Sequence, residues 1–226
     1  MVIKINPAML CADLSKLGEQ VKILSDAGVD LFHWDIMDGV FVHNFCLTPC
    51  IMAACRQYSN LPFEVHLCIS NPADFIKESV EAGAGIISLQ LETTPHIHRA
   101  VEQIHKYDVK AGIVINPSTP LSHAESILTE IQMITIMTID VGFVGQSFIY
   151  PMLDKVKALR EMITRKDLDI DIQVDGQVNV KTIDKVIKHG ANVLVIGSSG
   201  LFSLNKDLKI AVQIVKDQIH SSIISK

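Results

Sequence analysis

Eight short apolar runs recur along the whole chain, and this repetition constrains the fold more than any other feature of the sequence. Each run is rich in β-branched residues and is almost continuously apolar, whereas a strand with one face in water alternates apolar and polar residues. Continuously apolar strands indicate a parallel sheet that is covered on both faces. The predicted strands are Val2–Ile5, Leu31–Trp34, Phe63–Leu67, Ile86–Leu89, Ala111–Ile115, Ile134–Met137, Ile170–Val174 and Val193–Ile196.

Longer amphipathic stretches separate these strands, and several end at a glycine, such as Gly28, Gly83 and Gly190, which suits the C-terminal end of a helix. Eight βα units within 226 residues predict one (β/α)8 TIM barrel, an α/β fold that occupies residues 1–226 as a single domain. A doubly wound open sheet is the alternative. The predicted helices include Leu14–Leu24, Pro72–Ala82, Ile97–Tyr107, Met152–Ile163 and Val180–His189.

Composition and charge exclude several classes of protein. The chain is 48% hydrophobic and 20% charged, its net charge is -5, and no block of Lys and Arg stands out, which argues against nucleic-acid binding. No apolar run approaches the roughly 18 residues of a membrane span, and the first residues follow a strand pattern rather than that of a signal peptide. The five cysteines are odd in number and lack zinc-knuckle spacing. We therefore expect reduced thiols and a cytoplasmic protein.

Four residues of the kinds that bind metal ions lie at the ends of three predicted strands. His33 and Asp35 end the second strand, His66 ends the third, and Asp175 follows the seventh. The C-terminal ends of barrel strands meet at one face, so these nitrogen and oxygen donors are expected to form a site for one divalent metal ion. Zinc, manganese, cobalt and ferrous iron suit this donor set equally well. Taken singly, the His33–Asp35 pair more often indicates a hydrogen-bonded structural pair than a metal site, and a single histidine such as His66 is more often a core residue than a ligand.

Loops rich in glycine and serine follow the sixth and eighth predicted strands. Gly142 and Gly145 lie in the first loop, and Gly197 and Ser198 begin the second. Small residues allow backbone N–H groups to approach an anion closely, and TIM barrels frequently bind phosphate beside strands seven and eight. Each loop alone is equally consistent with a flexible connection. Because the two loops flank the seventh strand, together they predict a small phosphorylated substrate.

The two aspartates of the predicted metal site also suggest a reaction. Asp35 and Asp175 come from strands far apart in the order around the barrel, so they are expected to approach a central substrate from opposite sides. A divalent metal ion polarises a carbonyl group, and a carboxylate on each face of the adjacent carbon can then remove and return a proton. This combination predicts epimerisation next to a carbonyl group.

Five sequence motifs resemble the ribulose-phosphate 3-epimerase family from Pro7 to about Phe202: HWDIMDGVFVHN, EVHL, MTIDVGFVGQSFI, VDGQ and IGSSGLF. The resemblance implies a TIM barrel that inverts C3 of a ketose phosphate through a metal-stabilised cis-enediolate. It makes His33, Asp35, His66 and Asp175 the metal ligands and the two aspartates the acid/base pair. It also implies a homo-oligomer, either a dimer or a hexamer. The residues expected at the substrate and its phosphate are His66, Gly142, Gly145, Gly176, Gly197 and Ser198.

Several positions depart from the usual pattern of this family. Ala8 stands in place of a serine and Gln90 in place of a histidine, and Asp140 stands where a pentulose enzyme is expected to have asparagine. The segments MTID, MLDK and GSSGLF are closer to the D-allulose-6-phosphate 3-epimerase branch. We therefore expect conversion of D-allulose 6-phosphate to D-fructose 6-phosphate, with conversion of ribulose 5-phosphate to xylulose 5-phosphate as the alternative.

Two further functions remain as alternatives. A decarboxylase of the orotidine-phosphate type would need a lysine among its catalytic carboxylates, and none lies beside Asp35 or His66. A non-catalytic barrel that only binds a sugar phosphate is favoured by the changed residues around the substrate. The complete set of predicted ligands and bases argues against it.

Overall fold

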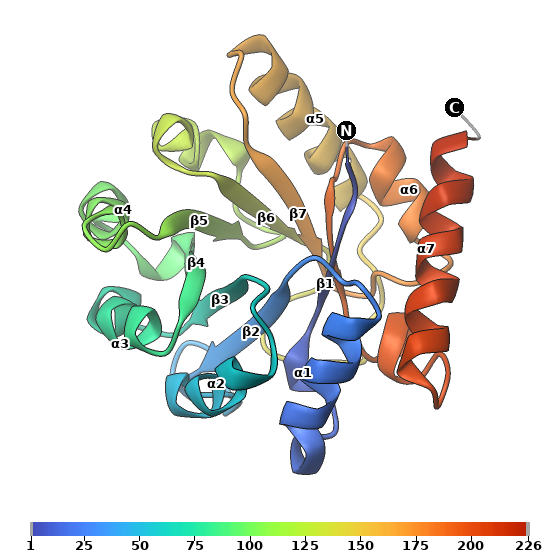
Figure 1. The fold of residues 1–226 in the computed structure, drawn as a ribbon. Helices are drawn as coiled ribbons and strands as arrows, with labels where there is room; N and C mark the ends of the chain where they lie inside the picture. Colours follow the sequence, from blue (N-terminus) through green and yellow to red (C-terminus); the bar gives the residue numbers. More distant parts are fainter. Residues whose placement is uncertain (1, 225–226) are drawn as a thin grey trace.

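The computed structural model describes residues 2–224, whose eight parallel strands curve into a nearly closed barrel with helices around it (Figure 1). Neighbouring strands follow the order β1-β8-β7-β6-β5-β4-β3-β2. A single parallel bridge between Ala8 and His33 joins the two ends of this order. The chain therefore forms the predicted (β/α)8 TIM barrel and not the open sheet. The strands are β1 Lys4–Pro7, β2 Phe32–Met37, β3 Phe63–Cys68, β4 Ala84–Gln90, β5 Lys110–Ile115, β6 Met133–Met137, β7 Asp171–Asp175 and β8 Val193–Ile196.

The α-helices of the described chain cover the outside of the barrel. They are α1 Leu17–Asp26, α2 Pro49–Cys55, α3 Ile76–Glu81, α4 Ile97–His105, α5 Met152–Arg165, α6 Ile183–Lys188 and α7 Leu208–Ile224. Short 3-10 or π turns occupy Met9–Cys11, Leu14–Lys16, Arg56–Tyr58, Pro72–Phe75, Leu91–Thr93 (η5), Leu121–His123, Leu128–Glu130 and Ser198–Phe202 (η8). None of the described helices is long and apolar enough to cross a membrane.

Several predicted helices are shorter than their apolar patterns. The stretch from Leu14 begins as a 3-10 turn because the Asp13 side chain accepts a hydrogen bond from the Ser15 backbone, and α1 starts three residues later. The first residues of the Pro72–Ala82 stretch also form a 3-10 turn before α3. The expected domain bounds include residues 1, 225 and 226, which lie outside the described residues.

Side chains inside the barrel form layers, as alternate strands point residues toward its axis. The bottom layer is apolar and comes from the even-numbered strands or the residue just before one of them: Leu31, Ile86, Met133 and Val193. The next layer above this apolar one is polar. The Asn6 amide donates to Gln173 Oε1 at 2.8 Å, and Asn6 and Gln173 both donate to Glu64 Oε2 at 3.3 Å. The apolar layer thus closes one end of the barrel and leaves its interior polar toward the other.

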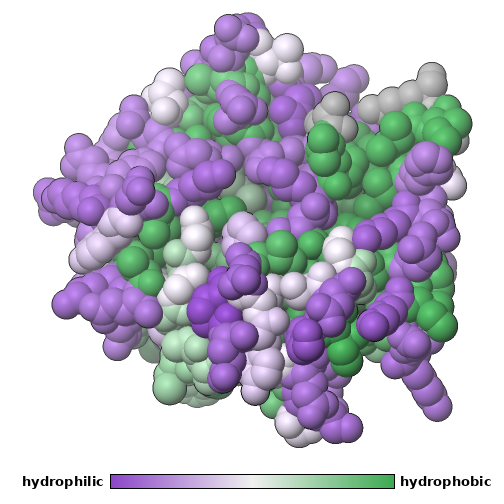
Figure 2. All heavy atoms as spheres, viewed as in Figure 1, coloured by the Kyte–Doolittle hydropathy of each residue, from purple (hydrophilic) through white to green (hydrophobic). Residues whose placement is uncertain are grey.

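The larger apolar core lies between the strands and the surrounding helices. Phe32, Trp34 and Phe63 point outward and are fully buried. The Phe63 ring packs edge-on against Phe32 with centroids 5.7 Å apart and lies 5.0 Å from the centroid of Trp34. Figure 2 shows polar side chains over most of the rim and apolar residues gathered on the side where α7 lies.

We expect Phe63→Ala to lower the free energy of unfolding by about 3–5 kcal/mol, because it leaves a cavity among packed rings. The matched control is Phe45→Ala, the same change at a side chain that is 80% exposed, which should alter stability by no more than about 0.5 kcal/mol. Urea unfolding followed by fluorescence or circular dichroism measures both. Similar losses in the two variants would show that the Phe63 cluster is not a principal part of the core.

Candidate functional site

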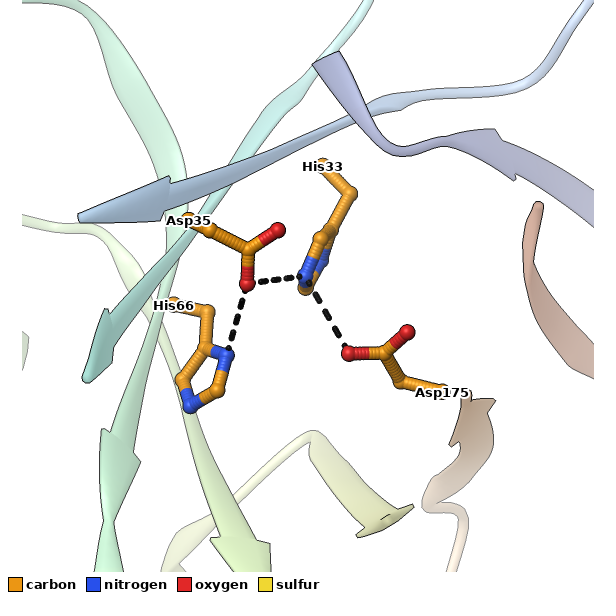
Figure 3. Close-up of side chains that lie close together, drawn as sticks. All are labelled: His33, Asp35, His66 and Asp175. Carbon is orange, nitrogen blue, oxygen red and sulfur yellow. Dashed lines mark hydrogen bonds and ion pairs between the residues drawn. The ribbon is translucent and has the colours of Figure 1, made fainter. Parts of the chain in front are cut away.

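The four predicted metal ligands come together inside the barrel, with His33 and Asp35 on β2, His66 on β3 and Asp175 at the end of β7 (Figure 3). Because β2 extends to Met37, His33 lies near the start of this strand and not at its end as the sequence predicts. One donor atom from each of His33, Asp35, His66 and Asp175 lies within 4.8 Å of the others. The strands place them there because His33 and Asp35 are two residues apart and so face the barrel interior together, and Asp35 pairs with His66 across the sheet. The structure thus assembles the cluster that the sequence predicts, and the roles of its members stay predictions.

Asp35 is at the centre of the cluster. Its Oδ1 atom lies 3.1 Å from His33 Nε2 and 3.1 Å from His66 Nδ1. On the other side, Asp175 Oδ2 lies 3.7 Å from the same His33 nitrogen. Both imidazoles are fully buried, and Asp35 is almost so. The two carboxylates therefore approach one buried space from different strands, with the His33 ring between them.

Glu64 fixes the orientation of His33 from behind. Its carboxylate is fully buried and bonds to His33 Nδ1 through Oε2, while Oε1 accepts the Ser88 hydroxyl at 2.5 Å. An ionised carboxylate can only accept hydrogen bonds, so His33 Nδ1 donates to Glu64. The other ring nitrogen, Nε2, then faces Asp35 and Asp175. A carboxylate behind a histidine ligand is the usual arrangement in metal sites.

The electrostatic environment separates the two aspartates. Burial would raise the pKa of Asp35, but the charge and hydrogen bond of His33 outweigh it and lower the pKa. Burial raises the pKa of Asp175 to about 6, with His33 opposing the shift and the charge on Asp35 adding to it. Burial also disfavours a charge on His33, yet Asp35 and Glu64 raise its pKa well above the usual value. Two carboxylates with proton affinities pushed apart are typical of an acid/base pair.

The donor set fits a divalent metal ion. It offers two imidazole nitrogens and two carboxylates, which suit zinc, manganese, cobalt or ferrous iron. The carboxylates of Asp35, Asp175 and Glu64 also place an excess of potential negative charge in a buried region. A divalent cation would offset this excess, so these residues could hold such an ion.

A cavity opens above the cluster, at the C-terminal face of the barrel. Asp35 and Asp175 form part of its wall, as do all five residues predicted to hold the phosphate: Gly142, Gly145, Gly176, Gly197 and Ser198. His66 is not part of this lining; it is fully buried and reaches the cluster through Nδ1. The structure therefore places His66 among the possible ligands of a metal ion rather than on the wall facing a substrate.

Two of the cavity glycines have backbone conformations that other residues rarely adopt. Gly145 has a φ of +83°, and an added Cβ would meet no atom within 4 Å, so its backbone borders open space. Gly176 has a φ of +116°, and an added Cβ would lie 2.6 Å from Ile139 Cγ1. Gly145 therefore needs to be glycine because of its backbone conformation, and Gly176 needs to be glycine because of both its conformation and its close packing.

Comparison with known proteins identifies the family. The Ribulose-phosphate 3 epimerase family matches residues 4–202. The ribulose-phosphate 3-epimerase of Bacillus subtilis is 41% identical over 199 residues, covering 88% of this chain and 92% of the relative. The chloroplastic ribulose-5-phosphate-3-epimerase of Arabidopsis thaliana is 43% identical over 197 residues, covering 86% and 70%. The chain belongs to the ribulose-phosphate 3-epimerase family.

The family assignment makes the protein an isomerase of the carbohydrate epimerase type. Solved structures add support for the fold alone. A 3-hexulose-6-phosphate synthase superimposes with a TM-score of 0.71 at 14% identity, covering 97% of this chain and 99% of that one. KGPDC from Streptococcus mutans gives a TM-score of 0.73 at 15% identity, covering 98% and 99%. The homo-oligomer and the cytoplasmic location stay predictions.

Sequence reasoning missed two residues that lie at this site. Glu64 lies two residues before His66, so the same strand periodicity that turns His66 inward should have drawn attention to it. Cys11 lines the cavity and hydrogen-bonds with Ser198, and burial raises the pKa of its thiol.

Asp38 organises the loops beside the site. Its Oδ1 atom accepts the backbone N–H groups of Val40 and Phe41, and its Oδ2 atom accepts the N–H and hydroxyl groups of Ser70, both at 2.7 Å. Burial opposes the charge on Asp38, but the hydrogen bonds from Ser70 and the loop lower its pKa to about 2. The side chain thus joins the loop after β2 to the loop after β3.

Replacing Asp38 with Ala should lower the free energy of unfolding by about 1–3 kcal/mol at pH 7, since donors that the carboxylate satisfies lose their partner. The folded pKa is below the unfolded one, so this stabilisation is present above about pH 4 and disappears as the pH falls toward 2. Urea unfolding of the wild-type protein and Asp38→Ala at several pH values across this range measures the difference in their free energies of unfolding. A difference independent of pH would show that the charge of Asp38 does not matter.

Proposed function

We propose that the protein interconverts D-ribulose 5-phosphate and D-xylulose 5-phosphate by inverting C3. The observation that carries this proposal is the pair of carboxylates, Asp35 and Asp175, that approach one buried space from β2 and β7 on either side of His33. The relatives named ribulose-phosphate 3-epimerase, which match most of this chain, support the choice of a pentulose phosphate.

The glycine loops would hold the phosphate at the far side of the cavity. Gly145, Gly197 and Ser198 line the cavity, and backbone N–H groups there would present partial positive charge to an anion. The residues Met37 and Met137 also line the cavity and are almost fully buried, so they would exclude water from the reacting carbon. A phosphate held at one end would place the carbonyl end of the sugar near the two aspartates.

The reaction needs one base and one acid on opposite faces of C3. The carbonyl at C2 acidifies the proton on C3, so one aspartate removes that proton as negative charge moves to the C2 oxygen. The other aspartate, already protonated, returns its own proton to the opposite face and inverts the centre. When bound by the four ligands, a divalent metal ion supplies positive charge that stabilises the substrate oxygens. The reverse reaction uses the same two groups with their roles exchanged.

D-Allulose 6-phosphate is the second candidate substrate. It is favoured by Ala8, which lines the cavity and offers no hydroxyl group where the family usually has serine. Asp140, the other residue behind this expectation, is not part of the cavity lining; its backbone carbonyl accepts a hydrogen bond from the Gln146 side chain at 2.6 Å. Nothing in the comparisons points to the hexulose-phosphate branch, so the pentulose substrate is the better supported of the two.

A direct comparison of the two substrates tests this choice. We expect kcat/KM to be higher for D-ribulose 5-phosphate, by about 10-fold or more, because one additional hydroxymethyl group in a fitted site costs about 1–3 kcal/mol. Initial rates with both substrates under the same metal and buffer conditions measure the ratio. A higher kcat/KM for D-allulose 6-phosphate than for D-ribulose 5-phosphate would assign the protein to the hexulose-phosphate branch. The proposed inversion at C3 would not be affected by that result.

The two-base scheme predicts the behaviour of Asp175→Asn. Inversion at C3 should fall by about 10²–10⁴-fold, as expected when one general acid/base group is lost. Exchange of the C3 proton with heavy water should survive for one epimer, through Asp35, in preparations that still contain metal. Asp184→Asn, an exposed position on α6, is the matched control and should leave the rate unchanged. Inversion by Asp175→Asn at the wild-type rate would rule out the scheme.

A further inference from the structure

The second imidazole of the cluster has its own partner behind it. His66 Nε2 lies 2.8 Å from Gln90 Oε1, and both side chains are fully buried. Gln90 ends β4, the strand next to β3, and the sequence here departs from the histidine usual in the family. An amide can present either its oxygen or its nitrogen to a neighbour, so the next contact decides which way Gln90 faces.

That next contact is Glu92. Gln90 Nε2 donates to Glu92 Oε2, and Glu92 Oε1 accepts the backbone N–H of Asn116 at 3.0 Å and the hydroxyl of Thr119. A carboxylate surrounded by three donors acts as an acceptor only. The NH₂ group of Gln90 therefore faces Glu92, and its oxygen faces His66.

The direction of these hydrogen bonds assigns the tautomer of His66. Because the Gln90 oxygen can only accept, His66 Nε2 carries the proton and donates it. Nδ1 is then the ring nitrogen that faces Asp35, 3.1 Å away, and it is the one that can give up its proton and bind a metal ion while Nε2 stays hydrogen-bonded to Gln90. A histidine protonated at Nδ1 could not bind a metal through that atom. The direction of the hydrogen bonds from His66 through Gln90 to Glu92 therefore matters for metal binding.

Lys155, within the MLDK segment of α5, holds the loop at the outer end of this series of hydrogen bonds. Its Nζ atom donates to the carbonyl oxygens of Asn116, Pro117 and Thr119 at 3.1, 2.7 and 2.8 Å. The loop after β5 is thereby tied to α5, and this loop supplies two of the donors that hold Glu92. A continuous series of contacts thus runs from His66 through Gln90 and Glu92 to α5.

We propose that Gln90, Glu92 and Lys155 are positioning residues that fix the tautomer and orientation of His66 as a metal ligand. None of the three lines the cavity, so they act through His66 and not on the substrate. The inference rests on the proposed function only in requiring a metal ion at the cluster. His33 is held directly by a carboxylate, Glu64, whereas His66 is held by a neutral amide that a carboxylate orients.

The test measures metal affinity without substrate. Gln90→Leu removes the acceptor, and Glu92→Leu removes the group that orients it, so both should raise the Zn²⁺ dissociation constant by about 10–100-fold. Gln90→His supplies a new acceptor for His66 and a donor for Glu92, and it should restore most of the affinity. Competition with a chromophoric chelator gives the constants, and the absorption spectrum of the Co²⁺ form reports the change in ligand geometry.

Thr94→Val is the matched control. The Thr94 hydroxyl donates to the backbone carbonyl of Gln90 at 2.8 Å, so this change disturbs the same segment without touching the chain of side chains. Its metal affinity should stay at the wild-type value. Thermal unfolding by circular dichroism verifies that each variant is folded. Glu92 lies at the surface, so its variant carries the test if Gln90→Leu does not fold.

Wild-type Zn²⁺ affinity in folded Glu92→Leu and Gln90→Leu would overturn the proposal, as would an equal loss in Thr94→Val. The outcome is separable from that of the proposed function. If the wild-type protein binds metal but does not invert ribulose 5-phosphate, the function fails while the affinities still test the positioning role. If the wild-type protein is an active epimerase and the variants keep their metal, the positioning role alone fails.

Discussion

The hydrogen bond between Glu64 and His33 is the interaction on which the centre of this barrel depends. It places a charged group in a fully buried position, which is costly unless the charge is paired and hydrogen-bonded. The structure meets that condition with donors from four other strands, since Ser88, Asn6 and Gln173 also bond to the carboxylate. The same carboxylate therefore connects the strands and directs His33 Nε2 toward Asp35 and Asp175.

The layered interior explains how the barrel separates stability from chemistry. The apolar layer of Leu31, Ile86, Met133 and Val193 closes one end, and the polar groups above it are held by one another. The carboxylates of Asp35 and Asp175 lie nearer the other end, where changes in the loops would not disturb the packing below. A metal ion would bind to donors already oriented by the interior, so little rearrangement would accompany binding.

The strands and the ligand cluster could be predicted because both depend on simple periodicity. Apolar runs indicate buried parallel strands, and the spacing of two between His33 and Asp35 turns both side chains inward. The connection from β5 to β6 could not be predicted in this way, because it holds only 3-10 turns among the described residues. The chain from His66 through Gln90 to Glu92 depends on amide orientation and on contacts between different strands, which no local pattern shows.

We propose that four side chains bind one divalent metal ion and that this ion is needed for the inversion of C3. The most direct test is the metal content of the purified protein, measured by inductively coupled plasma mass spectrometry beside its epimerase activity. We expect about one divalent ion per chain in the wild-type protein, loss of both metal and activity in His66→Ala, and recovery of activity when metal is returned to chelator-treated wild-type protein. Full activity in chelator-treated protein that contains no metal, or unchanged metal content in His66→Ala, would contradict it.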